Sequence, residues 1–220
     1  MLLSLADFLI TVWVELSTIA CDGPVDKTVE MECGDSKMKM SKLQMAVVAA
    51  ACLVTVLLRV RDSGLPFRLD SMIALTLVCG ALIRHPAAIF LPLAVRLLTD
   101  TMLSFQSGYG FYPSMLFDYS AYLLIALAAR YIPIPRYSTV IGGGFVGPVM
   151  FFVISNFGVW SLWPDTYAHT LTGLVSCYTQ GLPFLRYSLA GNVPFALAFL
   201  GAWHLATVAN AATYSVADTK

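Results

Sequence analysis

Charged residues are scarce in this sequence. Asp, Glu, Lys and Arg make up 12% of its 220 residues, while hydrophobic residues make up 58%. Soluble globular proteins have about 25% charged residues, so this chain has too few charges to cover a soluble surface, and a lipid bilayer has to cover the rest. Its 13 basic and 13 acidic residues cancel, and no basic run can neutralise a line of phosphates. We therefore expect the bilayer as a partner, and no nucleic acid.

Residue patterns that carry catalytic or metal chemistry are also missing. Cys52, Cys79 and Cys177 lie in apolar stretches, where a thiol behaves as a small hydrophobic group. Cys21 and Cys33 pair only if their segment faces an oxidising compartment. The sequence has no CxxC, no Cys and His at metal-site spacing, and no P-loop, GxSxG or HExxH motif. We expect no metal, no cofactor and no enzymatic activity.

Long apolar stretches fill the chain after residue 42. A membrane-crossing helix needs about 20 apolar residues. Two of the stretches are short and either cross a thin region or dip into the membrane and return, which requires protein or water around them. The sequence thus predicts an all-α, polytopic transmembrane bundle with six crossings and one short helix, with seven crossings as the alternative. The stretches are 43–60, 71–83, 87–103, 115–132, 139–160, 170–185 and 188–208.

The chain divides into an N-terminal extension, residues 1–42, and a transmembrane domain, residues 43–210. Residues 1–20 are apolar apart from Asp7 and Glu15 and lack the features of a signal peptide. The extension ends in Lys37-Met-Lys-Met-Ser-Lys42, which resembles the start of a bacterial membrane protein. Either translation begins at Met38 or Met40, or residues 1–42 form an extra helix or interfacial arm.

The positive-inside rule gives an orientation for seven crossings. Seven Lys and Arg residues then fall on one side and four on the other, which favours a cytoplasmic start for the first span. The larger group is Lys37, Lys39, Lys42, Arg84, Arg130, Arg136 and Arg186, and the smaller is Arg59, Arg61, Arg68 and Lys220.

Arg96 and Asp100 lie four residues apart within the third apolar stretch. This spacing places them on one helix face, where they can form an ion pair. A charge at membrane depth normally faces a bundle interior, a cavity or a partner. Asp100 is therefore a contact for a ligand or ion, or the partner of Arg96 in a neutralised structural pair, or simply a residue at the water boundary. Asp118 stands near the start of its helix and is interpreted as favourable to the helix dipole.

Small residues mark two helix-packing faces. Gly143 and Gly147 form a GxxxG pair, which lets a neighbouring helix approach closely, and Pro148 can kink that helix. Ala46 and Ala50, together with Ala49, form a second small-residue face suited to docking a helix or another protein.

Polar and aromatic residues are concentrated between residues 156 and 192. Trp160, Trp163 and Tyr167 fit an aromatic belt at the membrane interface. Asn156 and Asn192 are different, because a buried carboxamide needs hydrogen-bond partners from a neighbouring helix or a bound solute.

Several short motifs carry a resemblance to a family of uncharacterised bacterial integral membrane proteins, over residues 72–203. They include Asn156-Phe-Gly-Val-Trp160, Tyr167-x2-Thr170-Leu-x-Gly173-Leu-x2-Cys177-Tyr178 and Pro183-Phe-x-Arg186. The helix count and the Pro-Phe motif are also distantly similar to the S components of energy-coupling-factor transporters. That resemblance implies a multi-pass protein of the bacterial inner membrane whose Ala46–Ala50 face docks a coupling subunit that works with ATPases. Asn192 stands where S components usually have an acidic residue.

Two functional hypotheses follow. In the first, the chain is a transport component that binds a small solute through Asp100, Asn156, Trp160, Tyr167 and Asn192. In the second, it is a non-transporting scaffold or assembly protein whose small-residue faces pack partners and whose polar residues only join helices.

Overall fold

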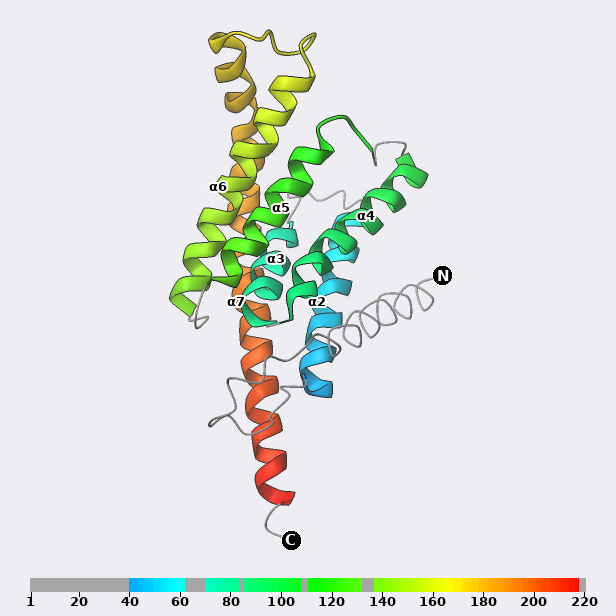
Figure 1. Ribbon diagram of the computed structural model, residues 1–220, viewed down its shortest axis with the longest axis vertical. Coiled ribbons are helices and arrows are strands. Elements are labelled where there is room, and N and C mark those ends of the chain that lie inside the picture. The colour runs from blue at the N-terminus through cyan, green and yellow to red at the C-terminus, as the bar shows by residue number, and fades with distance from the viewer. Residues whose placement is uncertain (1–39, 62–69, 84, 108–110, 132–136, 218–220) are drawn as a thin grey trace, which may run out of the picture.

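The computed structural model describes residues 40–61, 70–83, 85–107, 111–131 and 137–217, with side chains to residue 211. These parts of the chain fold into helices joined by short connections and contain no strand (Figure 1). The predicted all-α class is therefore confirmed, while residues 1–39 of the N-terminal extension lie outside the described residues. The elements are α2 (Lys42–Val60), α3 (Met72–Leu82), the 3-10 helix η1 (Pro86–Phe90), α4 (Leu91–Ser107), α5 (Met115–Arg130), α6 (Tyr137–Leu162) and α7 (Leu171–Ala217).

The short helix α3 forms the centre of the bundle. It contacts each of the other five described α-helices, and residues 71–80 are all buried. Its 11 residues span only about 16 Å at 1.5 Å per residue, which is half the hydrocarbon thickness of a bilayer. Burial on all sides explains why its sequence is apolar on every face. The short stretch 71–83 is thus an internal helix surrounded by protein.

Helix α2 begins with a reciprocal cap. The Ser41 hydroxyl accepts a hydrogen bond from the Gln44 backbone N–H at 3.1 Å, and the Gln44 side chain accepts one from the Ser41 N–H at 3.0 Å. Both interactions satisfy N–H groups that a helix start leaves unpaired. Gln44 also donates to Thr207 of α7 at 3.2 Å, and Asn210 donates to Ser41. The start of α2 therefore lies beside the C-terminal part of α7.

Helices α6 and α7 form a long antiparallel hairpin. Tyr137 at the start of α6 contacts His204 of α7, whereas Trp160 near its end contacts the turn at Ala168. Helix α7 has 47 residues, about 70 Å, and runs from one end of the molecule to the other (Figure 1). The stretches 170–185 and 188–208, which the sequence analysis treats as separate, are one continuous helix. The break proposed between them is wrong.

Two properties let α7 continue through this region. Pro183 and Pro194 stand inside the helix, which is tolerated in membrane helices when neighbouring groups satisfy the freed backbone. The polar side chain of Asn192 is satisfied along the helix, since it donates to the backbone carbonyl of Ser188 at 2.9 Å and to its hydroxyl at 3.0 Å.

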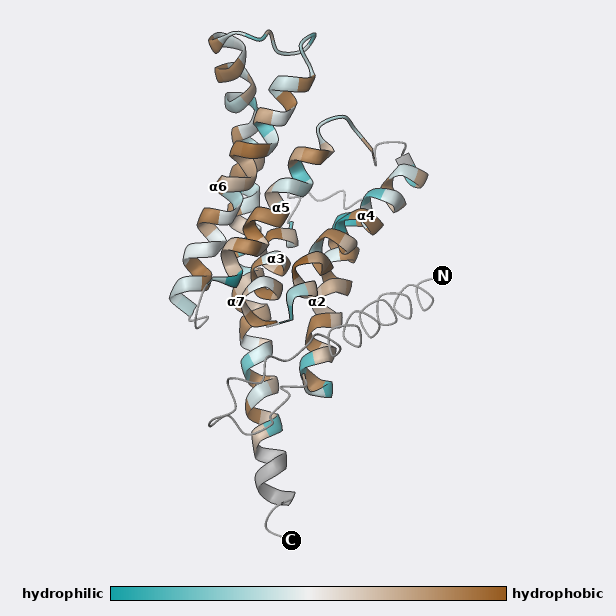
Figure 2. Ribbon diagram, in the orientation of Figure 1, coloured by the Kyte–Doolittle hydropathy of each residue, from teal (hydrophilic) through white to brown (hydrophobic). Residues whose placement is uncertain are grey.

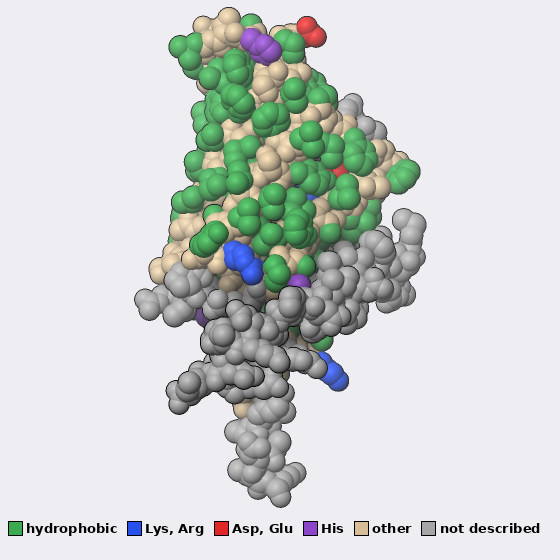
Figure 3. All heavy atoms as spheres, in the orientation of Figure 1, with side chains coloured by type: hydrophobic (Ala, Val, Ile, Leu, Met, Phe, Trp, Pro, Cys, Tyr) green, Lys and Arg blue, Asp and Glu red, His purple; other side chains and the backbone are tan. Residues whose placement is uncertain are grey.

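Four helical segments of the described chain are long and apolar enough to cross a membrane: Lys42–Val60, Pro86–Gln106, Tyr137–Leu162 and Leu171–Ala211. Hydrophobic residues run along these helices, and the polar ones lie mostly near helix ends and in loops (Figure 2). Among the described residues on the face shown in Figure 3, hydrophobic side chains are common and charged ones are few. Length and composition thus agree with a membrane protein.

Glycines set the close contacts among α3, α5 and α6. A Cβ on Gly147 would lie 2.7 Å from the Ile73 side chain, and one on Gly143 would lie 3.1 Å from Leu77. On α3, a Cβ on Gly80 would lie 2.5 Å from the carbonyl oxygen of Ala126. The GxxxG pair therefore lies against α3. Ala46 and Ala50, by contrast, are exposed.

Candidate functional site

The most unusual feature of the interior is a cluster of four charged side chains from three helices. Arg59 comes from α2, Arg96 and Asp100 from α4, and Asp118 from α5. Arg59 stands one residue before the end of α2, and Asp118 is in the first turn of α5. The helix ends thus bring the four side chains, called here the charge cluster, to one level of the bundle.

Asp100 is the centre of the charge cluster. One carboxylate oxygen accepts a hydrogen bond from Arg59 Nη2 at 2.8 Å, and the other accepts one from Arg96 Nε at 2.8 Å. The second oxygen also accepts from the Tyr119 hydroxyl at 3.1 Å. The predicted pairing of Arg96 with Asp100 is confirmed. The carboxylate thus accepts hydrogen bonds from two guanidinium groups and one phenol. Hydrogen bonds to an ionised group are charge-assisted and stronger than those between neutral groups.

Arg96 connects Asp100 to the rest of the cluster. Its Nη2 group lies 3.4 Å from an Asp118 carboxylate oxygen and donates to the Tyr112 hydroxyl at 2.7 Å. The guanidinium carbon also lies 5.5 Å from the centre of the Tyr122 ring, within cation–π range. The cluster is thus one connected network.

Tyr112, in the loop before α5, closes the cluster at one side. Its hydroxyl donates to the Asp118 carboxylate. Burial raises the pKa of the Tyr112 phenol above its usual value, and Asp118 adds to this shift although Arg96 opposes it. The phenol therefore stays protonated near neutral pH and remains a donor to Asp118.

Burial makes these charges costly. Arg96 is 5% exposed and Asp100 is 1% exposed. The Arg59 side chain is 18% exposed, and its buried Nε atom has no hydrogen-bond partner among the described residues. Two positive and two negative charges balance, so the cluster can persist in a low-dielectric interior.

The other sequence-predicted site residues lie elsewhere. Asn156 donates to the Phe152 carbonyl at 2.8 Å within α6, and its own side-chain oxygen would lie 2.5 Å from a Cβ on Gly181. Trp160 donates from its indole to Ala168 at 3.1 Å, and the Tyr167 hydroxyl donates to Gln180 at 3.2 Å. These three residues lie toward the end of the α6–α7 hairpin at which α6 turns into α7.

Asn192 joins α7 to α3. Its side-chain oxygen accepts a hydrogen bond from the Ala74 backbone N–H at 2.8 Å, near the start of α3, where backbone donors have no partner in their own helix. Its amide nitrogen is satisfied by Ser188, so the described contacts of Asn192 are all within the chain. The structure therefore does not gather the five predicted residues into one pocket.

Sequence reasoning missed Arg59, Tyr112, Tyr119 and the pairing of Asp118. Arg59 is counted only for the orientation and Asp118 is interpreted as favourable to the helix dipole, because sequence distance does not show that α2, α4 and α5 meet there. One signal was available: Arg59 follows an otherwise apolar stretch and conflicts with the orientation that the other basic residues favour.

A second glycine pattern lies in the same segment as the GxxxG pair, and the sequence analysis does not predict it. Gly142-Gly-Gly144-Phe-Val-Gly147 has the GxGxxG spacing of a dinucleotide-binding loop, which requires a strand before it and a helix after it. Here the whole pattern lies inside α6. Gly144 packs against Val193, where a Cβ would lie 3.0 Å from its side chain. Gly143, Gly144 and Gly147 pack against neighbouring helices, and the segment forms no phosphate loop.

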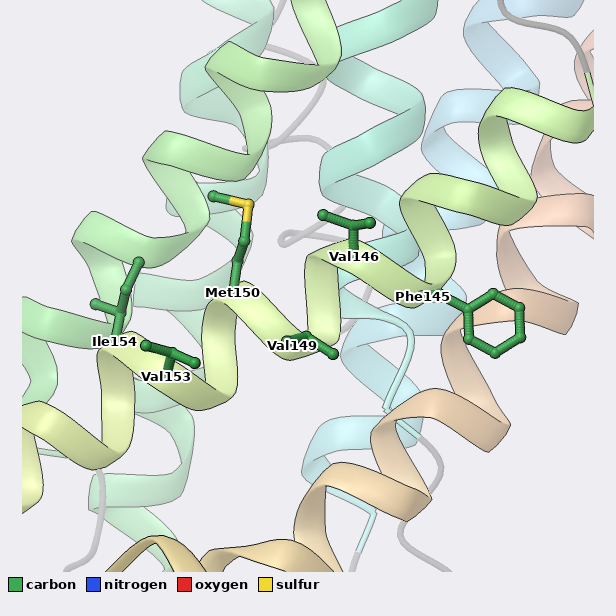
Figure 4. A pocket seen from close by; sticks show the side chains of 6 residues that line it. All are labelled: Phe145, Val146, Val149, Met150, Val153 and Ile154. Atoms are coloured by element: carbon green, nitrogen blue, oxygen red, sulfur yellow. The ribbon is translucent and has the colours of Figure 1, made fainter. Parts of the chain in front are cut away.

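An open depression of about 500 Å³ lies on the outer face of α6 (Figure 4). All six lining side chains are apolar and come from that one helix: Phe145, Val146, Val149, Met150, Val153 and Ile154. It offers no polar contact to orient a solute. Nor do the described residues contain a group of three His, Cys, Asp or Glu side chains that could hold a metal ion.

Comparison with known proteins gives a family. Residues 39–214 match DUF6580, a family of unknown function. The chain belongs to DUF6580. The DUF6580 match covers every described helix almost completely and includes the whole charge cluster, while it leaves residues 1–38 outside. No curated protein and no solved structure matches this DUF6580 chain.

Proposed function

We propose that this DUF6580 protein is a membrane transport component that binds a small solute at the charge cluster. The observation that supports this is the meeting of Arg59, Arg96, Asp100 and Asp118 inside a bundle of apolar helices. Ionisable groups at membrane depth are costly and are usually found on substrate or ion pathways. The arrangement moves the proposed site from the α6–α7 hairpin to α2, α4 and α5.

In this proposal α2, α4, α5, α6 and α7 each cross a bacterial inner membrane. The short helix α3 sits inside the bundle, and α7 crosses once. The Ala46–Ala50 face is exposed, so it is open to a coupling subunit like those that serve energy-coupling-factor S components. Active transport would need separate ATPase subunits, and no chemical step is assigned to this chain.

A thermal-shift screen of the detergent-purified protein tests the proposal. The panel contains vitamins, cobalamin precursors, nucleobases and metal ions. A ligand at 100 times its Kd stabilises the native state by about 2.7 kcal/mol. The shift should be lost in the double variant Arg96→Met/Asp100→Leu, which removes one charge of each sign, and retained in Asp165→Asn, which changes an exposed loop residue.

The alternative is a scaffold that holds other membrane proteins. It is favoured by the internal satisfaction of Asp100 and by the exposed apolar face of α6 in Figure 4. If no compound of the panel gives a saturable thermal shift, the result supports this alternative against the transport proposal.

A further inference from the structure

Arg186 of α7 lies outside the bundle interior. Its side chain is exposed. Apolar side chains surround it along the helix, with Leu182 51% and Phe184 73% exposed. A cation on an apolar outer surface is unusual in a membrane protein, so its depth along the helix matters.

The contacts between α6 and α7 fix that depth. Gly144 of α6 packs against Val193 of α7, and the Tyr178 hydroxyl of α7 donates to the Val153 carbonyl of α6 at 2.7 Å. Arg186 lies midway between Val193 and Tyr178 in the sequence. It is therefore level with residues near 149, at the middle of α6 (Tyr137–Leu162).

Aromatic residues mark the two ends of α6. Tyr137 and Trp160 are 23 residues apart in one helix, about 35 Å. Aromatic side chains of this kind favour the two membrane interfaces, and the hydrocarbon core between them is about 30 Å thick. On the proposed crossing of the membrane by α6, on which this inference rests, Arg186 lies close to the middle of the bilayer.

The guanidinium is also held close to its own helix. Its Nη2 group donates to the Tyr187 hydroxyl at 3.2 Å, and its carbon lies 4.9 Å from the centre of the Tyr187 ring. The ion pairs among the described residues use Arg59 and Arg96, and none uses Arg186. The side chain of Arg186 is exposed, so its remaining donors lie at a depth where water does not satisfy them.

We propose that Arg186 is the contact point for a helix of a different membrane protein that carries one Asp or Glu at mid-depth. A lipid headgroup fits less well, because phosphates lie about 15 Å from the mid-plane of a 30 Å core and Tyr187 holds the guanidinium back. A second copy also fits less well. Within the described residues the carboxylates are Asp100 and Asp118 of the charge cluster, Asp70 bonded to Met72, and Asp165 at the hairpin turn.

The experiment uses full-length chain in phosphatidylcholine vesicles with a labelled synthetic helix of Leu and Ala. One probe carries a single Glu at its centre, a second carries Gln there, and a third carries Glu near one end. Energy transfer between labels gives the apparent affinity. We expect the central Glu probe to bind at least tenfold more tightly than either control probe. Arg186→Leu should abolish the preference, and Arg186→Lys should keep part of it. Leu182→Ala is the matched surface control.

Four outcomes would overturn the proposal. The first is equal binding of the three probes to the wild-type chain. The second is an unchanged preference for the central Glu probe in Arg186→Leu. The third is self-association of the chain that Arg186→Leu removes, which would assign Arg186 to a homo-oligomer. The fourth comes from repeating the assay in vesicles that also contain phosphatidylglycerol: an Arg186-dependent contact that appears only there would assign Arg186 to lipid.

Circular dichroism and vesicle flotation establish that each variant is folded and inserted. Because Arg186 lies outside the charge cluster, Arg186→Leu should keep any solute-induced thermal shift. Failure of the solute screen and failure of the helix-binding assay are therefore separate results.

Discussion

Asp100→Asn is the sharpest perturbation of the charge cluster. The substitution keeps the size and shape of the side chain but removes its charge, so Arg59 and Arg96 are left with Asp118 as the only described carboxylate of the cluster. Asp100 accepts from both arginines at 2.8 Å and is 1% exposed. Removing one partner of a buried pair costs about 3–5 kcal/mol, because an uncompensated charge stays in the interior.

The double variant Arg96→Met/Asp100→Leu separates the cost of the lone charge from the value of the pair. Replacing a buried ion pair by apolar residues of similar volume is often neutral or stabilising. Arg59 keeps partial access to solvent, with 18% of its side chain exposed. We therefore expect the double variant to be more stable than Asp100→Asn.

Equilibrium unfolding in mixed detergent micelles, followed by circular dichroism, measures both effects. Asp165→Asn is the control, and a surface substitution of this kind should change stability by no more than about 0.5 kcal/mol. If Asp100→Asn lies within about 1 kcal/mol of wild type, or if the double variant is the less stable of the two, then Asp100 is not the buried counter-charge described above.

Three further predictions concern helix packing and the edge of the cluster. Gly147→Ala should destabilise by about 1–3 kcal/mol, because its Cβ meets Ile73 at 2.7 Å; Gly142→Ala, with nothing within 4 Å, is the control in the same unfolding assay, and equal effects would contradict the packing. Asn192→Leu leaves the Ala74 N–H without its acceptor and should cost about 1–3 kcal/mol, seen also as faster amide exchange at Ala74; unchanged exchange would argue against this bond. Tyr112→Phe removes the donor to Asp118 and should cost about 0.5–3 kcal/mol; because the pKa of this phenol is raised, the loss should be the same at pH 6 and pH 8, and a loss that changes between them would contradict a protonated donor.

The sequence predicted the helices better than it predicted their meeting points. Apolar length alone located α2 and α6 to within about two residues, which is the usual uncertainty of helix ends. The prediction of a helix end near Arg186 was wrong. A charge between two apolar runs is typical of a loop, whereas here α7 continues through Arg186. The burial of α3 on every face could not be predicted from the sequence either. An apolar stretch of 11 residues is equally compatible with a helix that crosses a thin region of the membrane.

The candidate site was predicted in part for a related reason. The spacing of Arg96 and Asp100 is local, so the helix period alone brings them together. The contacts of Arg59 and Asp118 depend on how three helices pack, over separations of 41 and 22 residues, and no local pattern encodes them. Asn192 shows the converse, since its need for a partner was clear from the sequence but its partner on α3 was not.

The bond between Asn192 and Ala74 has a consequence for how the protein is made. Its two residues are 118 positions apart, so at about 5–20 residues per second the ribosome needs roughly 6–24 seconds to deliver the acceptor after Ala74 has been synthesised. During that interval α3, too short to cross the bilayer by itself, lacks one of the contacts that hold its start. Its final position is therefore reached only after most of the chain has left the ribosome, which makes the last helix a requirement for completing the first half of the bundle.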